Sequence, residues 1–316
     1  MKHIFVGPKY ETIINSNFFD GSITLFGENR DGNISYAEEV VFEYWNPDNN
    51  PLEIDIYNKS IAKITDEVDI MAHNPQIVSK CILPSNVHLI CKNEEQLLRM
   101  LDNKIETRNL MKEEVPMLKY YNIKGKDISY KKLRSIASEF VVQHPIGSGG
   151  SKTFLYNENT YEKIDLILKK EEYYSVSIYQ KNNIPYNIHC IIFSEKIEIL
   201  APSEQILEKT ELIEYIGSEF EVEISKEIKK KLEKYSLKLC KKIQKLGYRG
   251  VLGIDFIAVD NELYFIEINP RFQGSTAKVD KLLKESNLPS IFEYNYSAFY
   301  NIKMPSPKYM KHSVVV

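Results

Sequence analysis

Short apolar runs separated by polar connections fill the first hundred residues of the chain. Four of these runs predict β-strands, at residues 4–6, 23–26, 68–71 and 87–90. Residues 75–82 predict a short helix that crosses over between the last two strands. Strands joined by such crossovers favour a small parallel sheet. A dinucleotide-binding domain is disfavoured, because no G-x-G-x-x-G loop follows the first strand.

Helical patterns follow this region. Asn93, with Gln96 three residues on, predicts the N-cap of a helix that continues to Leu101. Residues 102–114 are helical in composition and end before Val115-Pro116, because the residue before a proline avoids the helical conformation. We place the first domain boundary near residue 102.

The rest of the chain combines strands with one long helix. Residues 129–139 predict a helix that leads into a strand at 140–143, and residues 173–200 are rich in strands. A further helix is predicted over residues 225–246, with Gly247 in the position of a C-cap. Its apolar residues recur at helical spacing: Ile228, Leu232, Tyr235, Leu239, Ile243 and Leu246.

Glycine is dense in one stretch, G-S-G-G-S-K-T at residues 147–153. One interpretation is a flexible hairpin tip. The other is a cradle whose N–H groups bind phosphate while Lys152 adds a charge. A P-loop is disfavoured, because it needs glycine where this chain has Ser151 and Ile146.

Polar residues interrupt two apolar runs near the C-terminus, I-D-F-I-A-V and L-Y-F-I-E-I-N. Side chains alternate along a strand, so Glu267 and Asn269 share one face, while Ile266 and Ile268 are expected on the other.

The turn of this hairpin decides whether Asp255 joins the polar face. A two-residue turn at Asp260-Asn261 would put Asp255 and Glu267 on opposite faces. A three-residue turn that includes Glu262 would pair the two acids. We favour the longer turn, because it gathers the polar groups into one cluster.

Two carboxylates and an amide oxygen on one face suit a hard cation. Such ligands are typical of magnesium bound to a nucleotide rather than of zinc or iron. The alternative is a hairpin with one solvent-facing side. Pro270-Arg271 and a loop of small residues follow at once and favour the metal interpretation. Arg271 would stabilise an anion, and the amides of Gly274 and Ser275 would hold a carboxylate or an oxyanion.

Composition is that of an ordinary globular protein. The chain has 316 residues, 43% hydrophobic and 27% charged, which favours two or three sub-domains. A net charge of −3 predicts no nucleic-acid partner, and no apolar run has the length of a membrane span. Without CxxC or zinc spacing, the four cysteines are expected to be reduced thiols of a cytoplasmic protein: Cys81, Cys91, Cys190 and Cys240.

Together these features resemble the ATP-grasp superfamily of carboxylate–amine ligases over most of the chain. Residues 247–256 resemble the first metal-ligand strand of that family, and residues 267–271 resemble the second. Residues 147–153 resemble the mobile loop that covers the phosphates. Residues 103–108 resemble the start of the grasp, where a lysine contacts the nucleotide.

The resemblance implies an α/β fold, with α+β character in the grasp part. We expect a small parallel α/β domain at residues 1–102. The small ATP-grasp subdomain, with the glycine-rich lid loop, would occupy residues 103–180. The large subdomain, with the metal site, would occupy residues 181–316.

The resemblance also implies a mechanism. ATP would phosphorylate a carboxylate, and an amine would displace phosphate from the acyl phosphate, with release of ADP and phosphate. Magnesium, or manganese in its place, would neutralise the transferring group. Arg271 would stabilise the acyl-phosphate oxygens. The implied metal ligands are Asp255, Glu267 and Asn269. The implied nucleotide contacts are Lys104 and the loop residues Gly147, Ser148, Gly149, Gly150 and Lys152.

Three positions bear on nucleotide binding in a different way. Gln143 stands where the strand before the glycine loop usually carries a lysine, so phosphate binding would rest more on the two lysines. The expected adenine hinge, residues 175–180, lacks the usual glutamate and lysine, which leaves backbone groups and Gln180. Asn187 falls near a position that often meets the ribose or the phosphates.

The leading functional hypothesis is an ATP-dependent ligase that joins a small-molecule carboxylate, such as an amino acid, to an amine. A catalytically degenerate ATP-binding protein of the same fold is the alternative, which Gln143 favours. A purely structural α/β protein is the third. Carboxylation and ligation to a thiol are further activities of the family, and a homodimer is an open expectation.

Overall fold

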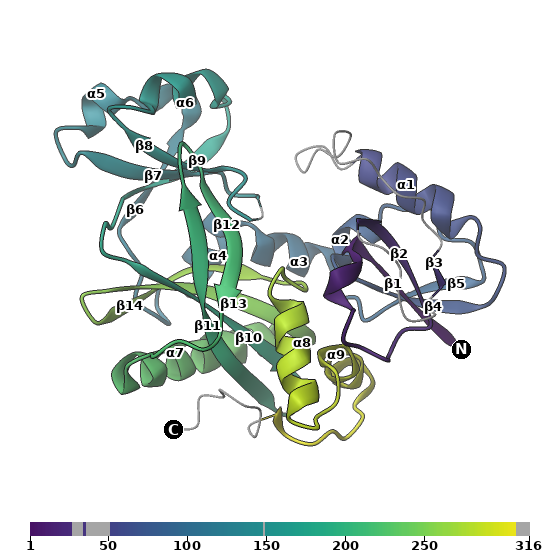
Figure 1. The fold of residues 1–316 in the computed structure, drawn as a ribbon. Helices are drawn as coiled ribbons and strands as arrows, with labels where there is room; N and C mark the ends of the chain where they lie inside the picture. The colour runs from purple at the N-terminus through teal and green to yellow at the C-terminus, as the bar shows by residue number, and fades with distance from the viewer. Residues whose placement is uncertain (27–33, 36–50, 148, 308–316) are drawn as a thin grey trace.

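Three β-sheets follow one another along the chain in a computed structural model, which describes residues 1–26, 34–35, 51–147 and 149–307. The N-terminal sheet lies to one side, a four-stranded sheet forms an upper lobe, and a five-stranded sheet lies below that lobe (Figure 1). The parallel N-terminal sheet and the two antiparallel sheets after it confirm the predicted fold class.

The N-terminal sheet is parallel throughout and has the order β3-β2-β1-β4-β5. Its elements are β1 (Lys2–Lys9), η1 (Tyr10–Thr12), β2 (Gly21–Phe26), β3 (Ile34–Ser35), α1 (Pro51–Ile61), β4 (Val68–Ala72), α2 (Pro75–Val78) and β5 (Val87–Ile90). The four predicted strands are confirmed. Helix α2 is one turn long and does not reach residue 82, because the N–H groups of Lys80 and Cys81 bond three residues back and the N–H of Ile82 donates to Asn58 Oδ1 at 2.8 Å.

Two consecutive helices, α3 (Glu95–Asp102) and α4 (Lys104–Met111), lead from this sheet into the rest of the molecule. Asn103 caps α4 by accepting from the N–H groups of Ile105 and Glu106. The predicted N-cap at Asn93 is wrong. The Asn93 side chain instead bonds both the N–H and the C=O of Arg249, at 2.8 Å each, and this tertiary contact removes it from α3.

The upper lobe is an antiparallel sheet with the order β6-β9-β7-β8. Its elements are β6 (Tyr120–Lys124), η3 (Gly125–Asp127), α5 (Tyr130–Leu133), β7 (Glu139–Gln143), β8 (Thr153–Asn157), α6 (Tyr161–Ile167) and β9 (Tyr173–Ile178). The predicted helix at 129–139 is a single turn, α5. Ser135 donates to the carbonyl of Lys132, a local bond that competes with the helix, and Glu139 is already part of β7.

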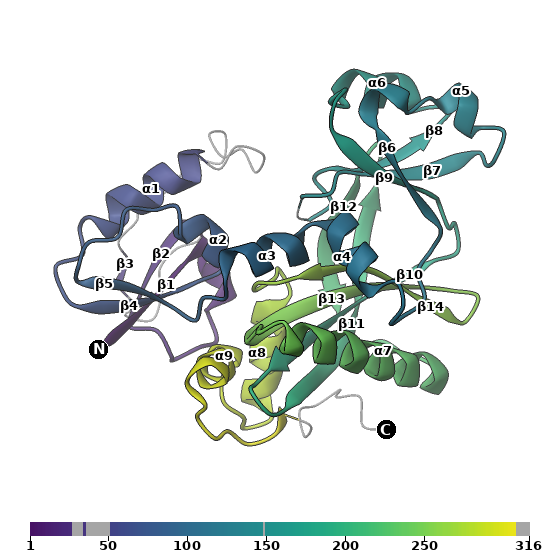
Figure 2. The ribbon, with the colours of Figure 1, turned by 180° about the vertical axis from the view of Figure 1, so that it is seen from behind.

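The five-stranded sheet is antiparallel, with the order β12-β11-β10-β13-β14. Its elements are β10 (Ile184–Ile192), β11 (Ile197–Lys209), β12 (Ile213–Glu219), α7 (Lys226–Lys245), β13 (Gly250–Val259), β14 (Glu262–Asn269), α8 (Thr276–Glu285) and α9 (Ile291–Tyr300). Helix α7 lies along one face, and α8 and α9 lie toward the N-terminal sheet (Figure 2). The predicted helix at 225–246 is thus confirmed, with Ser225 as its N-cap and Gly247 at a φ of 95° after its end.

All four cysteines are free thiols, as expected, and three of them are buried. Within the described ranges, no helix combines the length and the apolar character that crossing a membrane requires.

The turn of the β13–β14 hairpin differs from the prediction. Val259 pairs with Glu262, so the turn holds only two residues, Asp260 and Asn261. Their φ angles are 50° and 64°, and two central residues with positive φ are typical of a type I′ turn, whose twist matches that of the strands. The predicted three-residue turn is wrong.

A β-bulge at Ile266 nevertheless brings the two acids together. Phe256 pairs with Phe265, whereas the next residue, Asp255, pairs with Glu267. Ile266 is the extra residue on β14, and it shifts the register by one position. The predicted pairing of Asp255 with Glu267 is confirmed, but the bulge rather than the turn produces it.

Replacing Asn261 by alanine is expected to destabilise the protein by about 1 kcal/mol, because alanine pays a larger penalty than asparagine for a left-handed conformation. The matched control, Asn261→Gly, is expected to retain the stability of the unchanged protein. Thermal unfolding followed by circular dichroism measures both variants. An Asn261→Ala protein that melts together with the Asn261→Gly protein would contradict a strained position at this turn.

Candidate functional site

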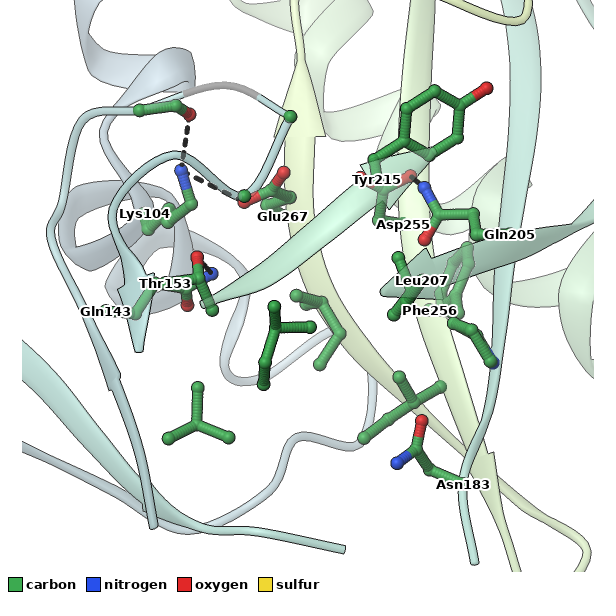
Figure 3. A pocket seen from close by; sticks show the side chains of 18 of the residues that line it. Lys104, Gln143, Thr153, Asn183, Gln205, Leu207, Tyr215, Asp255, Phe256 and Glu267 are labelled. Carbon is green, nitrogen blue, oxygen red and sulfur yellow. Dashed lines mark hydrogen bonds and ion pairs between the residues drawn. The ribbon is translucent and has the colours of Figure 1, made fainter. Parts of the chain in front are cut away.

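A cleft between the four-stranded and the five-stranded sheet is the main candidate site. The volume of this cleft is about 230 Å³. A second cavity, beside His73, has a volume of about 20 Å³, which is room for about one water molecule. Strands β7 and β8 and the glycine loop supply one wall, and strands β11 to β14 supply the other (Figure 3). Of these two cavities, the cleft alone has room for a substrate.

Asp255 and Glu267 lie inside this cleft on adjacent strands. Burial, and then the charge of Glu267, raise the pKa of Asp255 to about 7. Burial acts on Glu267 in the same direction, but the cations Lys104 and Arg108 hold the pKa of Glu267 below its usual value. Near neutral pH, the pair is therefore partly protonated and does not carry two full negative charges.

A network of side-chain amides surrounds Asp255. Its Oδ1 accepts from Asn187 Nδ2 at 2.6 Å and from Gln205 Nε2 at 3.2 Å, and its Oδ2 accepts from Asn269 Nδ2 at 3.0 Å. The amide oxygen of Asn269 in turn accepts from Arg271 Nη2 at 3.0 Å. Asn269 thus presents its nitrogen to Asp255, and Arg271 holds its oxygen.

These residues fit a hard divalent cation. In the described part of the chain, no three His, Cys, Asp or Glu side chains gather as a metal site. A cation here would therefore depend on the two carboxylates together with an amide oxygen. Two buried carboxylates on paired strands repel each other, and a cation between them would relieve that repulsion. The buried amide oxygen of Asn187 has no hydrogen-bond partner among the described residues, and it belongs to the same network.

Lys104, the first residue of α4, connects the acids with the glycine loop. It is 6% exposed, and its Nζ lies 3.1 Å from Glu267 Oε2. The same Nζ donates to the carbonyl oxygen of Gly147 at 2.9 Å (Figure 3). The charge of Lys104 is thus balanced by Glu267, and the hydrogen bond of Lys104 to Gly147 holds the loop close.

The glycine loop is docked against β12. The N–H of Tyr215 donates to the carbonyl oxygen of Gly149 at 3.0 Å. Gly150 has a φ of 86°, and a Cβ there would lie 1.9 Å from the carbonyl oxygen of Ile213. This contact admits only glycine. The loop residue Ser148 lies outside the described residues, and Lys152 is not among the described residues that line the cleft.

The loop after β14 forms the end of the cleft beside the acids. Arg271 Nη1 donates to the carbonyl oxygen of Phe272 at 3.2 Å, which together with the bond to Asn269 fixes the guanidinium. Gly274 and Ser275 line the cleft next to it, and the ring of Tyr215 lies against Gly274. The loop after β14 therefore places the fixed guanidinium of Arg271 beside two small residues, Gly274 and Ser275.

The structure brings most of the predicted site residues together. Those that line the cleft are Lys104, Gln143, Gly147, Gly149, Gly150, Gln180, Asp255, Glu267, Asn269, Arg271, Gly274 and Ser275. Asn187 is 1% exposed and lies beneath the cleft, where its Nδ2 donates to Asp255 and to Gln273. Ile266, expected to face away from the acids, lines the cleft as well, because the bulge turns it inward.

Sequence reasoning missed several lining residues. Arg108, Gln205 and Tyr215 all project into the cleft. Arg108 had a local signal, because it lies four residues after Lys104 and therefore on the same side of α4. Gln205 and Tyr215 had none, because pairing between strands places them there.

Comparison with protein families now adds to this geometry. Residues 101–275 match the model of the ATP-grasp domain. The chain belongs to the ATP-grasp family. A comparison with curated proteins finds no match.

Solved structures of ATP-grasp enzymes share the fold. The biotin carboxylase of Campylobacter jejuni, solved with β,γ-ATP, is 16% identical with a TM-score of 0.70, and the match covers 98% of this chain and 73% of that one. The phosphoribosylamine–glycine ligase of Thermotoga maritima is 17% identical with a TM-score of 0.64, and the match covers 96% of this chain and 77% of that one. The L-amino acid ligase of Bacillus licheniformis is 11% identical with a TM-score of 0.60, and the match covers 100% of this chain and 77% of that one.

Replacing Gly150 by alanine is expected to detach the glycine loop from β12, because the added Cβ cannot coexist with the carbonyl oxygen of Ile213. The amide proton of Tyr215, which bonds Gly149, should then exchange with solvent at least about tenfold faster. Hydrogen exchange followed by mass spectrometry measures this change.

Gly149→Ala is the matched control. Gly149 also has a positive φ, of 61°, but no atom lies within 4 Å of the Cβ that alanine would add. This variant carries the backbone strain without the collision and should preserve more of the protection. Equal exchange of the Tyr215 amide in Gly150→Ala and the unchanged protein would contradict the docked loop.

Proposed function

We propose that the protein is an ATP-dependent ligase that activates a carboxylate as an acyl phosphate and joins it to an amine. One observation supports the proposal above all others. The carboxylate pair Asp255 and Glu267, the fixed guanidinium of Arg271 and the docked glycine loop all border one cleft. Cation binding, anion binding and exclusion of water are the three requirements of phosphoryl transfer to a carboxylate.

In this proposal, Asp255 and Glu267 hold a magnesium ion, for which manganese can substitute. Asn269 completes the set through its amide oxygen, which Arg271 engages in this structure. The bound ion would neutralise charge on the phosphates. Magnesium needs deprotonated carboxylates, so the proton on Asp255 must leave when the ion binds.

The chain's own residues supply the remaining functions. Arg271 binds the substrate carboxylate and then the acyl-phosphate oxygens, beside the small loop residues Gly274 and Ser275. The glycine loop covers the nucleotide phosphates and keeps water from the acyl phosphate. Lys104, which pairs with Glu267 in this structure, would contact the nucleotide. Gln180, at the opposite end of the lining, is the proposed adenine contact.

The amine acceptor in this proposal follows the descriptions of two matched structures, although carboxylases match the chain over the same extent. The chain matches a structure described as an L-amino acid ligase over its whole length, and another described as a phosphoribosylamine–glycine ligase over nearly all of it. The matched carboxylases leave carboxylation as the competing activity. A catalytically degenerate ATP-binding protein is the second candidate, supported by the uncharged Gln143.

Purified protein with ATP, magnesium and a panel of amino acids and amines is expected to release ADP and phosphate only when both an acid and an amine are present. Coupled assays for ADP and phosphate, together with mass spectrometry of the product, measure this. Nucleotide binding without substrate-dependent ADP release would contradict the ligase and favour the degenerate protein. Turnover that depends on bicarbonate instead of an amine would favour carboxylation.

In the same assay, Glu267→Gln is expected to lower turnover at least about 100-fold, because it removes a metal ligand while keeping the size of the side chain. Glu262→Gln makes the same chemical change on the exposed end of β14 and should leave turnover unchanged. Circular dichroism should show that both variants fold. Near-normal turnover by Glu267→Gln would remove Glu267 from the metal site.

A further inference from the structure

Arg108 is a buried cation that the proposed mechanism does not use. It lies near the end of α4, is 7% exposed and lines the cleft. Its guanidinium donates from Nε to the carbonyl oxygen of Ile266 at 2.9 Å, from Nη1 to Ser175 Oγ at 2.7 Å and from Nη2 to Gln143 Oε1 at 2.7 Å. These acceptors belong to three strands, β14, β9 and β7, so the guanidinium is held in one orientation between the two sheets.

No acceptor of Arg108 carries a charge. Among the described residues, no carboxylate forms an ion pair with it, and Glu267, which acts on it from farther away, already pairs with Lys104. A buried charge without a counter-ion is costly. Burial accordingly lowers the pKa of Arg108. Arg108 thus places a positive charge at the wall of the cleft that no carboxylate among the described residues contacts directly.

The geometry of Arg108 also leaves donors for a ligand. A guanidinium has five N–H groups, and the three bonds to the chain account for one on each nitrogen. One N–H remains on each terminal nitrogen and can donate to oxygens of a ligand. The Tyr120 ring lies 5.4 Å from the guanidinium carbon and covers another side.

The position of Arg108 indicates which anion it meets. Gln143, which accepts from Arg108, also donates to Thr153 Oγ1 at 3.3 Å. Thr153 is the last residue of the glycine stretch and the first residue of β8. Arg108 therefore lies at the base of this loop, whereas Arg271 lies at the end of the cleft formed by the loop after β14.

We propose that Arg108 binds the phosphates of the nucleotide directly, and that Gln143 orients it. This inference rests on the proposed use of ATP but not on the acid or the amine that is joined. Arg108 on α4 would supply the positive charge that the uncharged Gln143 on β7 does not bring to the phosphates. Gln143 would then be a positioning residue. The alternative is that Arg108 only clamps the two sheets together.

Gln143→Glu separates these two interpretations, because they predict opposite results. The new carboxylate would pair with Arg108 and neutralise it without removing it. If Arg108 binds phosphate, the dissociation constant for ATP in the presence of magnesium should rise at least about tenfold, while the melting temperature of the nucleotide-free protein rises. If Arg108 is only a clamp, the stronger contact should leave ATP binding unchanged or tighter.

Isothermal titration calorimetry with ATP and differential scanning calorimetry provide both readouts. Asn183→Asp is the charge-matched control, because it adds the same charge to the lining of the cleft at a residue with no proposed nucleotide contact, away from Gln143 (Figure 3). This control should weaken ATP binding less than Gln143→Glu does. An equal loss of affinity in both variants would mean that any added negative charge in the cleft repels ATP, and it would overturn the inference. Arg108→Lys keeps the charge and should lose less affinity than Arg108→Met.

Ligase turnover is measured separately, so the inference and the proposed function can fail independently. Wild-type protein that binds ATP but ligates nothing would overturn the function, and the Gln143→Glu result would still decide the role of Arg108. Unchanged ATP affinity in Gln143→Glu, or an unchanged protein that binds no ATP with magnesium, would overturn the inference.

Discussion

The cleft depends on the pairing of two acids across β13 and β14. A two-residue turn alone would put Asp255 and Glu267 on opposite faces of the hairpin, and one extra residue at Ile266 restores them to the same face. The bulge also turns the carbonyl of Ile266 toward Arg108, whose bond to it ties α4 to the hairpin. A single irregularity of the backbone therefore determines both the pairing of the two acids and the position of the carbonyl that binds Arg108.

The charges of the cleft follow from that pairing. Burial and the charge of Glu267 raise the pKa of Asp255, whereas nearby cations lower the pKa of Glu267. Lys104 balances Glu267 and holds the glycine loop through Gly147, so the acids and the loop are connected before any nucleotide is present. Arg108 adds a further positive charge, which no carboxylate among the described residues contacts directly.

Local patterns in the sequence predict much of this fold. The N-terminal strands, the long helix α7 and the order of glycine loop, acid strand and Arg271 all follow from periodicity and motif. Features set by tertiary contacts do not follow. Asn93 has the pattern of an N-cap but bonds the backbone of Arg249, and the bulge at Ile266 is invisible in an alternating run. Arg108 shares one side of α4 with Lys104, but local spacing does not show that its three acceptors come from distant strands.

The most direct test of this account is a crystal structure of the protein with magnesium and a non-hydrolysable ATP analogue. The account predicts a magnesium ion bound by both Asp255 and Glu267, with the phosphates beneath the glycine loop. Magnesium bound elsewhere, with neither Asp255 nor Glu267 among its ligands, would contradict it.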